Sequence, residues 1–285
     1  MNRQGTLLIF WDYDTQWGGD RSRMPGGRKE WGDLEFVNTE RLLELHADFG
    51  VPACFAVVGS AALPGERPYH DPDQVRRIHG AGHEVASHSH RHEWLPALGG
   101  AELAETLRSS KDALEQCIGA TVRSFVPPYN QPFDFPRRWA FSLSERREAR
   151  AQRTDLGKLC AALRETGYEF CRVSYRSLAE HALARINPRL LDRPGRPETI
   201  GGLTCLRMNA PGGFNEQAHR VMDLCAAGGG IIVVGGHPHS LHAGNTQDEK
   251  NLVPFLEHAR RLNREGLLRL ARPCDLAGEN SGTGT

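Results

Sequence analysis

The chain has 285 residues, of which 39% are hydrophobic, and its 35 basic and 35 acidic residues give a formal net charge of zero. This length accommodates one large domain or two small ones. Because the sequence has no basic stripe and no apolar run of about 18 residues, we expect neither a nucleic-acid partner nor a membrane span.

Short apolar runs and amphipathic stretches alternate along the chain. The runs predict strands at residues 6–11, 51–59, 83–86, 124–126, 168–173, 203–208, 231–234 and 267–270. The amphipathic stretches and their capping residues predict helices at residues 38–50, 71–80, 101–117, 155–166, 215–227 and 250–264. Residues 18–32 and 186–200 are rich in Gly, Pro or Arg and are expected to be loops, the first of them a flap over the end of the first strand.

This alternation is typical of an α/β fold with a parallel sheet, either open or closed into a barrel. No repeat or linker divides the chain, so we expect a single domain over residues 1–275. Residues 131–152 are rich in Pro, aromatic residues and Arg and are expected to be an insertion or lid. Residues 276–285 are expected to be a disordered tail.

The seven cysteines and the N-terminus bear on where the protein works. The cysteines have no paired spacing and fall mostly in apolar segments, which predicts reduced thiols. Residues 1–5 lead straight into a short apolar run without the features of a secretory signal. We therefore expect a cytoplasmic protein whose substrates are small or linked to a carrier.

Polar motifs follow five of the predicted strands at their C-terminal ends. In a barrel these ends converge on one face, where active sites are built. We therefore expect the motifs to form one site. They are Asp12 and Asp14, His88 and His92, residues 127–129, Arg172, and His237.

A metal centre is the simplest use of these residues. His88 and His92 stand four residues apart, so one helical turn would put both imidazoles on one face. With Asp14, one pleat beyond Asp12, they form a three-ligand set with open positions, as in catalytic metal sites. Such a metal makes its bound water a nucleophile, with Asp12 as general base and His237 as general acid. The set predicts hydrolysis of an amide or ester.

Some neighbouring residues have open assignments. His239, two residues after His237, is the alternative general acid. His90 is expected to point away from the metal, toward the surface or the substrate. Trp94 could form a wall for a sugar ring or pack in the core. The other histidines considered are expected to be structural or solvated; they are His46, His79, His83, His181, His219 and His258.

The motifs resemble, in chain order, those of the polysaccharide deacetylase family (carbohydrate esterase family 4). Residues 12–14 resemble its first motif in a D-x-D variant, residues 82–92 its second, residues 125–129 its third, and His237 the histidine of its fifth. The resemblance implies a distorted (β/α)7-type barrel that binds one divalent metal ion. Zinc is the first expectation, and Co²⁺, Ni²⁺ or Fe²⁺ are alternatives.

The resemblance also implies a role for each matched residue. Asp12 is the implied base and His237 the implied acid. The implied metal ligands are Asp14, His88 and His92, and Pro128 and the backbone N–H of Tyr129 are placed at the oxyanion hole.

The chain departs from the family's motifs at three places. Val126 stands where the third motif begins with Arg, and we expect Arg172 to supply the cation that two adjacent carboxylates require. Gly235 stands where an apolar residue normally helps to hold the acetyl methyl, so the acyl pocket is expected to be wider or filled from elsewhere. No clear fourth motif is present.

The expected function is removal of an N-acetyl group from an amino sugar in a small molecule, nucleotide sugar, glycolipid or antibiotic precursor. A ring-opening amidase of the allantoinase or cyclic-imidase kind is the alternative on the same fold. Two His and one Asp also define the facial triad of non-haem Fe(II) oxygenases, which usually have a double-sheet β scaffold. A non-catalytic carbohydrate-binding relative is the remaining alternative, against which the complete set of acidic residues and histidines argues.

Overall fold

The computed structural model describes residues 4–21, 31–130, 155–174 and 178–276. The strands are β1 (Gly5–Tyr13), β2 (Cys54–Val57), β3 (Glu84–Ser87), β4 (Ser124–Phe125), β5 (Phe170–Val173), β6 (Glu198–Ile200), β7 (Leu203–Arg207), β8 (Gly230–Gly236) and β9 (Leu268–Ala271). The α-helices are α1 (Thr15–Arg21), α2 (Gly32–Phe49), α3 (Pro72–Gly80), α4 (Gly100–Ile118), α5 (Leu156–Glu165), α6 (Leu178–Ile186), α7 (Glu216–Gly228) and α8 (Glu249–Arg264). Single 3-10 turns are η1 (Gly59–Ala62), η2 (Leu95–Ala97), η3 (Pro128–Asn130), η5 (Pro188–Leu191), η6 (Pro238–Ser240) and η7 (Pro273–Leu276).

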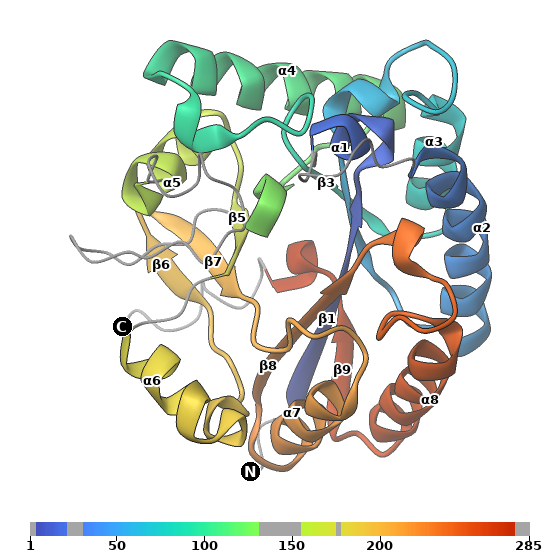
Figure 1. Cartoon of the computed structure of the whole chain (residues 1–285), viewed down its shortest axis with the longest axis vertical. Coiled ribbons are helices and arrows are strands. Elements are labelled where there is room, and N and C mark those ends of the chain that lie inside the picture. The colour runs from blue at the N-terminus through green and yellow to red at the C-terminus, as the bar shows by residue number, and fades with distance from the viewer. Residues whose placement is uncertain (1–3, 22–30, 131–154, 175–177, 277–285) are drawn as a thin grey trace.

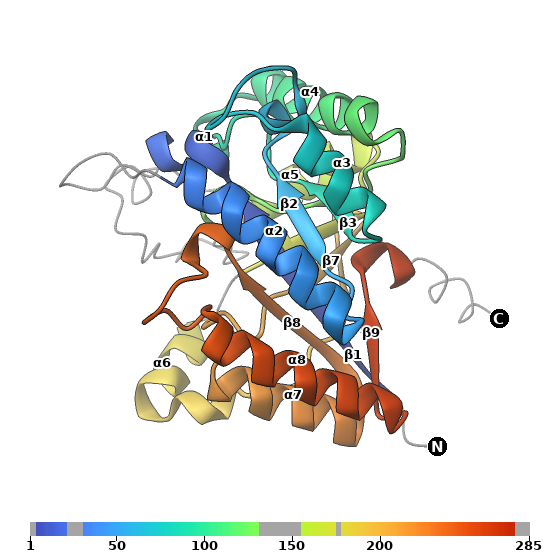
Figure 2. The same ribbon diagram turned by 90° about the vertical axis from the view of Figure 1, so that its right-hand side faces the viewer.

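The strands form one curled sheet with helices arranged around its outer side (Figures 1 and 2). The strand order is β6-β7-β5-β4-β3-β2-β1-β8, and β9 also pairs with β1. The β6–β7 pair is antiparallel and the other strand pairs are parallel. Ala210, after β7, forms a bridge with Val234 of β8, which draws the sheet toward closure. The result is a single α/β domain with a distorted barrel, as expected.

Alternation along the strands separates two cores. In β1, Leu7, Ile9 and Trp11 face the helices, whereas Leu8 and Phe10 belong to the core inside the barrel. Successive residues of a strand point to opposite faces, so the position two beyond Phe10 is again on the inner side. The same alternation continues from barrel-core residues to polar or small ones at other strand ends: Phe10 to Asp12, Ala86 to His88, Phe170 to Arg172, and Val233 to Gly235.

Most of the expected elements are present, and the sheet differs from expectation in one strand. All eight predicted strands exist, and β6 is an additional antiparallel strand within the region expected to be loop. Helix α2 begins at Gly32 rather than near Asn38, and Asp33 and Glu35 in its first turn favour the positive end of the helix dipole. The predicted insertion at residues 131–152 lies outside the described residues.

Two further expectations, a loop from residue 18 and a disordered tail from residue 276, were wrong at their first residues, and one helix was missed. Residues 18–21 belong to α1, where burial of Thr15, Gln16, Gly18 and Gly19 outweighs the poor helix propensity of two glycines. Helix α6 was not predicted at all. Leu276 is not part of a disordered tail, because it is 6% exposed and packs in the barrel core.

Among the described helices, none combines the length and the apolar character needed to cross a bilayer.

Two histidines of the interior are structural, as expected. Trp11 donates its indole N–H to His46 Nε2 at 2.9 Å, so the ring hydrogen of His46 sits on Nδ1 and is donated to the carbonyl oxygen of Val51 at 2.8 Å. Burial lowers the pKa of His46 to about 3. Burial also lowers the pKa of His83 to about 4, and its Nδ1 accepts from the backbone N–H of Ala53. The seven cysteines are free thiols.

Candidate metal centre and acid–base site

Asp14, His88 and His92 form a buried cluster at the C-terminal ends of the barrel strands. One ligand atom from each residue lies within 4.8 Å of the other two. Asp14 Oδ1 is 3.2 Å from His88 Nε2 and 3.5 Å from His92 Nε2, and each residue is 2% exposed. The structure thus brings together the three residues that the sequence assigned to a metal.

The backbone reason for this convergence differs from the expected helical turn. The segment that joins His88 to His92 is an irregular loop, in which Ser89 and His92 have φ values of 63° and 55°. Thr15 (φ 53°) and Tyr129 (φ 61°) are the other non-glycine residues with positive φ in the described part of the chain. Such conformations cost about 1–3 kcal/mol each and persist where surrounding contacts impose them, often at functional sites. His92 is part of the cluster, Thr15 and Ser89 directly follow Asp14 and His88 in the chain, and Tyr129 packs against His92.

The donor atoms of the cluster are arranged for a cation. His88 Nδ1 lies 2.7 Å from the carbonyl oxygen of Val126, which places the ring hydrogen there and turns the lone pair of Nε2 toward Asp14. Asp14 Oδ1 is buried and has no hydrogen-bond partner among the described residues. Burial would raise the pKa of Asp14, but His92 and His88 hold it well below its ordinary value. A divalent metal ion would balance a carboxylate that faces imidazole lone pairs, and these three residues fit such an ion.

Close packing holds Asp14 and His92 in place. A Cβ on Gly18 of α1 would lie 2.5 Å from the Cβ of Asp14, so only glycine leaves room for this aspartate. The ring of Tyr129 packs edge-on against His92 at 4.4 Å between centroids, and its hydroxyl donates to the carbonyl oxygen of His92 at 3.3 Å. Trp94 packs against Tyr129 at 5.4 Å. The substrate-wall role of Trp94 stays a prediction.

Asp12 and Arg172 form a buried bidentate ion pair. Arg172 Nη1 and Nη2 donate to Asp12 Oδ1 and Oδ2, both at 2.6 Å, and the two side chains are 2% and 6% exposed for Arg172 and Asp12. Burial would raise the pKa of Asp12, but the guanidinium of Arg172 and the neighbouring His88 hold it below its ordinary value. The pairing expected in place of the missing motif arginine is therefore present, and it favours the ionised form of Asp12.

The space beside Gly235 is filled from elsewhere, which was one of the two expectations for this position. A Cβ there would lie 3.2 Å from Met208 Cε, 3.3 Å from Arg172 Nη1 and 3.3 Å from the carbonyl oxygen of Phe10. A larger residue would press on the guanidinium that holds Asp12. Gly235 therefore leaves the room that the guanidinium of Arg172 occupies when it pairs with Asp12.

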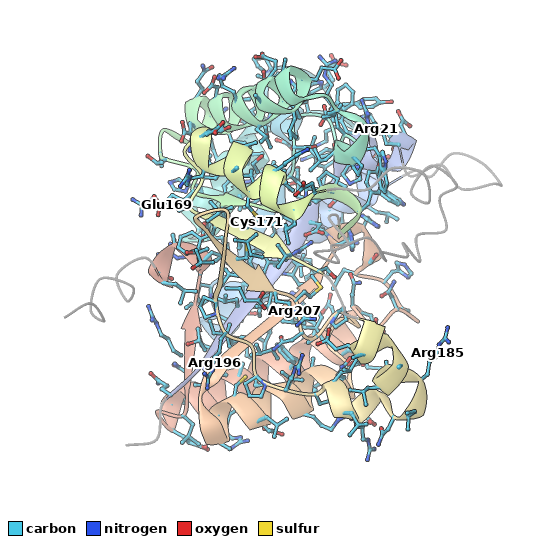
Figure 3. All side chains as sticks on the ribbon, turned by 90° about the vertical axis from the view of Figure 1, so that its left-hand side faces the viewer. Arg21, Glu169, Cys171, Arg185, Arg196 and Arg207 are labelled. Atoms are coloured by element: carbon cyan, nitrogen blue, oxygen red, sulfur yellow. The ribbon has the colours of Figure 1, made fainter. Side chains whose placement is uncertain are left out.

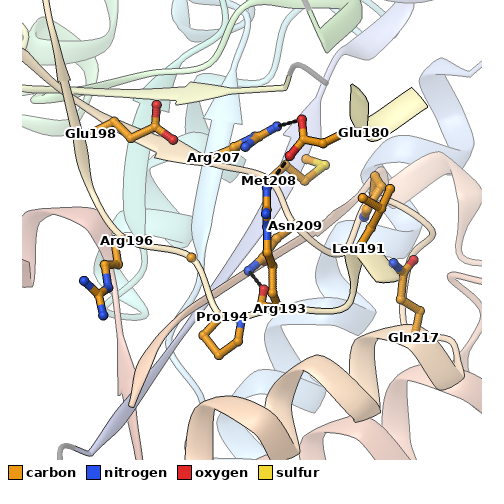
Figure 4. Close-up of a pocket in the computed structure, with 12 residues that line it drawn as sticks. Glu180, Leu191, Arg193, Pro194, Arg196, Glu198, Arg207, Met208, Asn209 and Gln217 are labelled. Atoms are coloured by element: carbon orange, nitrogen blue, oxygen red, sulfur yellow. Dashed lines mark hydrogen bonds and ion pairs between the residues drawn. The ribbon is translucent and has the colours of Figure 1, made fainter. Parts of the chain in front are cut away.

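A separate cavity of about 240 Å³ lies on the other side of Met208 (Figure 4). It is lined by α6, β6, β7 and the segment before β6, and Figure 3 shows Arg207 and Arg196 on this side of the molecule. Glu180 accepts hydrogen bonds from Arg193 and, at 2.6 Å, from Arg207. The cavity's lining contains none of the metal-cluster residues, and part of its charge is paired internally.

The two candidate acids occupy different environments. His237 Nε2 lies 3.9 Å from Asp12 Oδ2, and its side chain is 34% exposed. His239 Nδ1 lies 3.1 Å from Glu35 Oε2, and its ring stacks on Trp31 with centroids 4.0 Å apart. The side chain of His237 is therefore partly open to solvent beside Asp12. The side chain of His239 is instead held by Glu35 and Trp31.

Glu35 is the residue of this region that sequence reasoning missed. It is fully buried on α2, and burial together with the charge of Asp14 raises its pKa well above the ordinary value. Because Glu35 lies 204 residues before His239, the sequence gives no indication that the two side chains meet.

His90, expected at the surface or near the substrate, is half-buried.

Comparisons with known proteins agree with this geometry. Residues 32–137 match the family model described as polysaccharide deacetylase. A stretch of 94 residues is 33% identical to a chitooligosaccharide deacetylase of Sinorhizobium fredii and covers 33% of this chain and 41% of that protein. A candidate polysaccharide deacetylase from Mycobacterium smegmatis shares the fold with a TM-score of 0.61 and 16% identity, over 98% of this chain and 91% of that one. The Puue allantoinase shares it with a TM-score of 0.62 and 15% identity, over 98% and 90%.

Proposed function

The chain belongs to the polysaccharide deacetylase family, and we propose that it is a metal-dependent hydrolase that removes an N-acetyl group from an amino sugar. The observation that carries this proposal is the buried Asp14–His88–His92 cluster, with the Asp12–Arg172 ion pair as its neighbour. Ligand set, base and acid occur together at one end of the barrel, as hydrolysis of an amide requires.

The metal ion is held by Asp14, His88 and His92 in this proposal, with zinc the first choice for two imidazoles and a carboxylate. When bound, it supplies a Lewis acid that polarises the acyl carbonyl and lowers the pKa of a coordinated water. The Nδ1 contact of His88 to a backbone carbonyl fixes the tautomer that this role needs.

The residues around the metal move the protons. Asp12 accepts a proton from the attacking water, and the two hydrogen bonds from Arg172 hold its carboxylate in one orientation. His237 donates its Nε2 proton to the departing amine nitrogen as the C–N bond breaks. The products are acetate and the free amino sugar. The backbone N–H of Tyr129, in the strained turn after Pro128, is the proposed donor to the carbonyl oxygen in the transition state.

An acetylated amino sugar is the substrate class that the family and the Sinorhizobium relative support. Since the aligned stretch spans less than half of that relative, its oligosaccharide substrate is one candidate among small and carrier-linked sugars. The allantoinase that shares the fold makes ring opening of a cyclic amide the reaction to exclude.

The test combines elemental analysis with an acetate-release screen on the purified protein. We expect about one metal ion per chain, and acetate release from N-acetylglucosamine oligomers or nucleotide-linked N-acetylglucosamine that stops when a chelator removes the metal. Ring opening of allantoin or hydantoin without acetate release would refute the deacetylase assignment. Turnover that requires oxoglutarate or O₂ would refute hydrolysis altogether.

A further inference from the structure

We infer that Glu35 and Asn38, one turn apart on α2, are positioning residues that hold the 237–239 loop and thereby aim His237 at the leaving group; this rests on the proposed function. The two side chains reach the loop from the same helix. Asn38 Nδ2 donates to the carbonyl oxygen of Pro238 at 2.8 Å, and Glu35 Oε2 lies 3.1 Å from His239 Nδ1.

The loop is held at each of its three residues. The backbone N–H of His237 donates to Gln247 Oε1 at 2.7 Å. The carbonyl oxygen of Pro238 accepts a hydrogen bond from Asn38, and the side chain of His239 contacts Glu35. Three consecutive contacts leave this backbone little freedom to shift.

His237 itself depends on that backbone. Among the described residues its ring makes a single ion-pair contact, and the 3.9 Å to Asp12 Oδ2 is too long for a hydrogen bond. Its side chain is also one-third exposed, so packing does not lock the ring. The position of the proton donor is therefore set by the loop, and the loop by α2.

His239 is the tether in this arrangement rather than a second acid. Its ring lies flat on Trp31, with an interplanar angle of 6°, and its Nδ1 is engaged by a carboxylate that is fully buried. The same ring lies 5.0 Å from the ring of His237. Because Glu35 is fully buried on α2, its side chain has little room to move, which makes it a firm anchor for the loop.

The test compares two acetyl substrates that differ in their need for an acid. An N-acetylglucosamine oligomer must have its amine protonated to leave, whereas 4-nitrophenyl acetate releases a phenolate that needs no proton. A misplaced acid therefore slows the amide and spares the ester. A displacement of about 1 Å can cost about 100-fold in rate.

The variants are Glu35→Leu and Asn38→Ala, with Glu35→Gln as the conservative rescue, since its amide oxygen can still accept from His239. Glu44→Leu is the matched control, because Glu44 lies on the same helix and pairs only at the surface with Arg41. We expect kcat for the amide to fall at least 10-fold in the first two variants, with ester hydrolysis and metal content within twofold of wild type. Glu35→Gln and Glu44→Leu should retain at least half of the amide activity.

Two outcomes overturn the inference: unchanged amide turnover in Asn38→Ala, or equal losses on amide and ester. Asn38 is half-buried, so this variant remains informative if Glu35→Leu does not fold. If the wild-type protein hydrolyses neither substrate, the proposed function fails. Histidine ring NMR then tests the positioning alone, since Asn38→Ala must shift the His237 signals and Glu44→Leu must not.

Discussion

Replacing Arg172 with glutamine tests the logic of the site most directly. Arg172 donates two charged hydrogen bonds of 2.6 Å to Asp12, and both side chains are almost fully buried. Glutamine retains a donor but removes the charge. Asp12 is then a buried carboxylate beside Asp14 without its counter-ion, and this is the kind of change that costs about 3–5 kcal/mol of stability.

The expected pKa change follows from the same contact. Charges separated by roughly 4 Å interact by about 4 kcal/mol at an effective dielectric constant near 20. Because removing the guanidinium removes an interaction of this size, the pKa of Asp12 should rise in the variant. In the wild-type protein the pKa of Asp12 is lowered, so its stabilising contribution is present at neutral pH and is lost as pH falls through that pKa.

In Arg172→Gln the contribution of ionised Asp12 to the free energy of unfolding changes sign. With its pKa raised, Asp12 destabilises the fold at neutral pH and ceases to do so once it is protonated. Denaturant unfolding should therefore show a gap between variant and wild type of about 3–5 kcal/mol at pH 7 that narrows toward pH 5. The acidic limb of the acetate-release profile should move to higher pH, because the proposed base is then protonated over a wider pH range.

Two controls separate this explanation from general damage. Arg108→Gln breaks an ion pair with Glu105 in which the two side chains are 60% and 69% exposed, and it should cost under about 1 kcal/mol. The double variant Asp12→Asn/Arg172→Gln removes both charges and should recover at least about 1 kcal/mol relative to Arg172→Gln. A gap that stays constant with pH, or a double variant less stable than the single one, would refute the reasoning.

Four other changes have defined outcomes. Asp12→Asn should keep about one metal per chain by elemental analysis while kcat falls about 10²–10⁴-fold, because the proposed proton acceptor is lost and the three proposed metal ligands remain. Asp14→Asn should lose the metal in elemental analysis, because it replaces the carboxylate of the proposed three-ligand set. His46→Gln should flatten the loss of stability between pH 6.5 and 3, which reaches about 5 kcal/mol in wild type because the unfolded histidine takes up a proton that the folded one, with a pKa of about 3, does not. Gly235→Val should cost about 1–3 kcal/mol in denaturant unfolding as Met208 is displaced.

Much of the fold follows from periodicity in the sequence. The buried run before Asp12 has an apolar sequence, as a strand covered on both faces requires, and it became β1, which pairs with β2, β8 and β9. The polar motifs were predicted to converge because parallel strands end on one face of a barrel, and Asp14, His88 and His92 do so. These are consequences of local pattern and chain topology.

The parts that were not predicted depend on contacts between distant residues. The spacing of His88 and His92 suggested a helical turn, but a left-handed backbone at Ser89 and His92 brings the rings together instead. Positive φ at a serine or histidine has no reliable sequence signal, because tertiary contacts impose it. The approach of Glu35 to His239 is of the same kind, since α2 and the loop after β8 meet only in the folded chain.

Two carboxylates two residues apart can serve one reaction only if they remain different. Asp12 has its counter-charge in the protein, as the guanidinium of Arg172 donates to both of its oxygens. Asp14 has no such partner among the described residues, and its buried Oδ1 faces two imidazole nitrogens. The first is thereby kept ionised, as the proposed base must be, whereas the second would acquire its counter-charge from a metal ion. Because Arg172 reaches Asp12 past Gly235, the absence of a side chain at that position maintains the difference between the two aspartates.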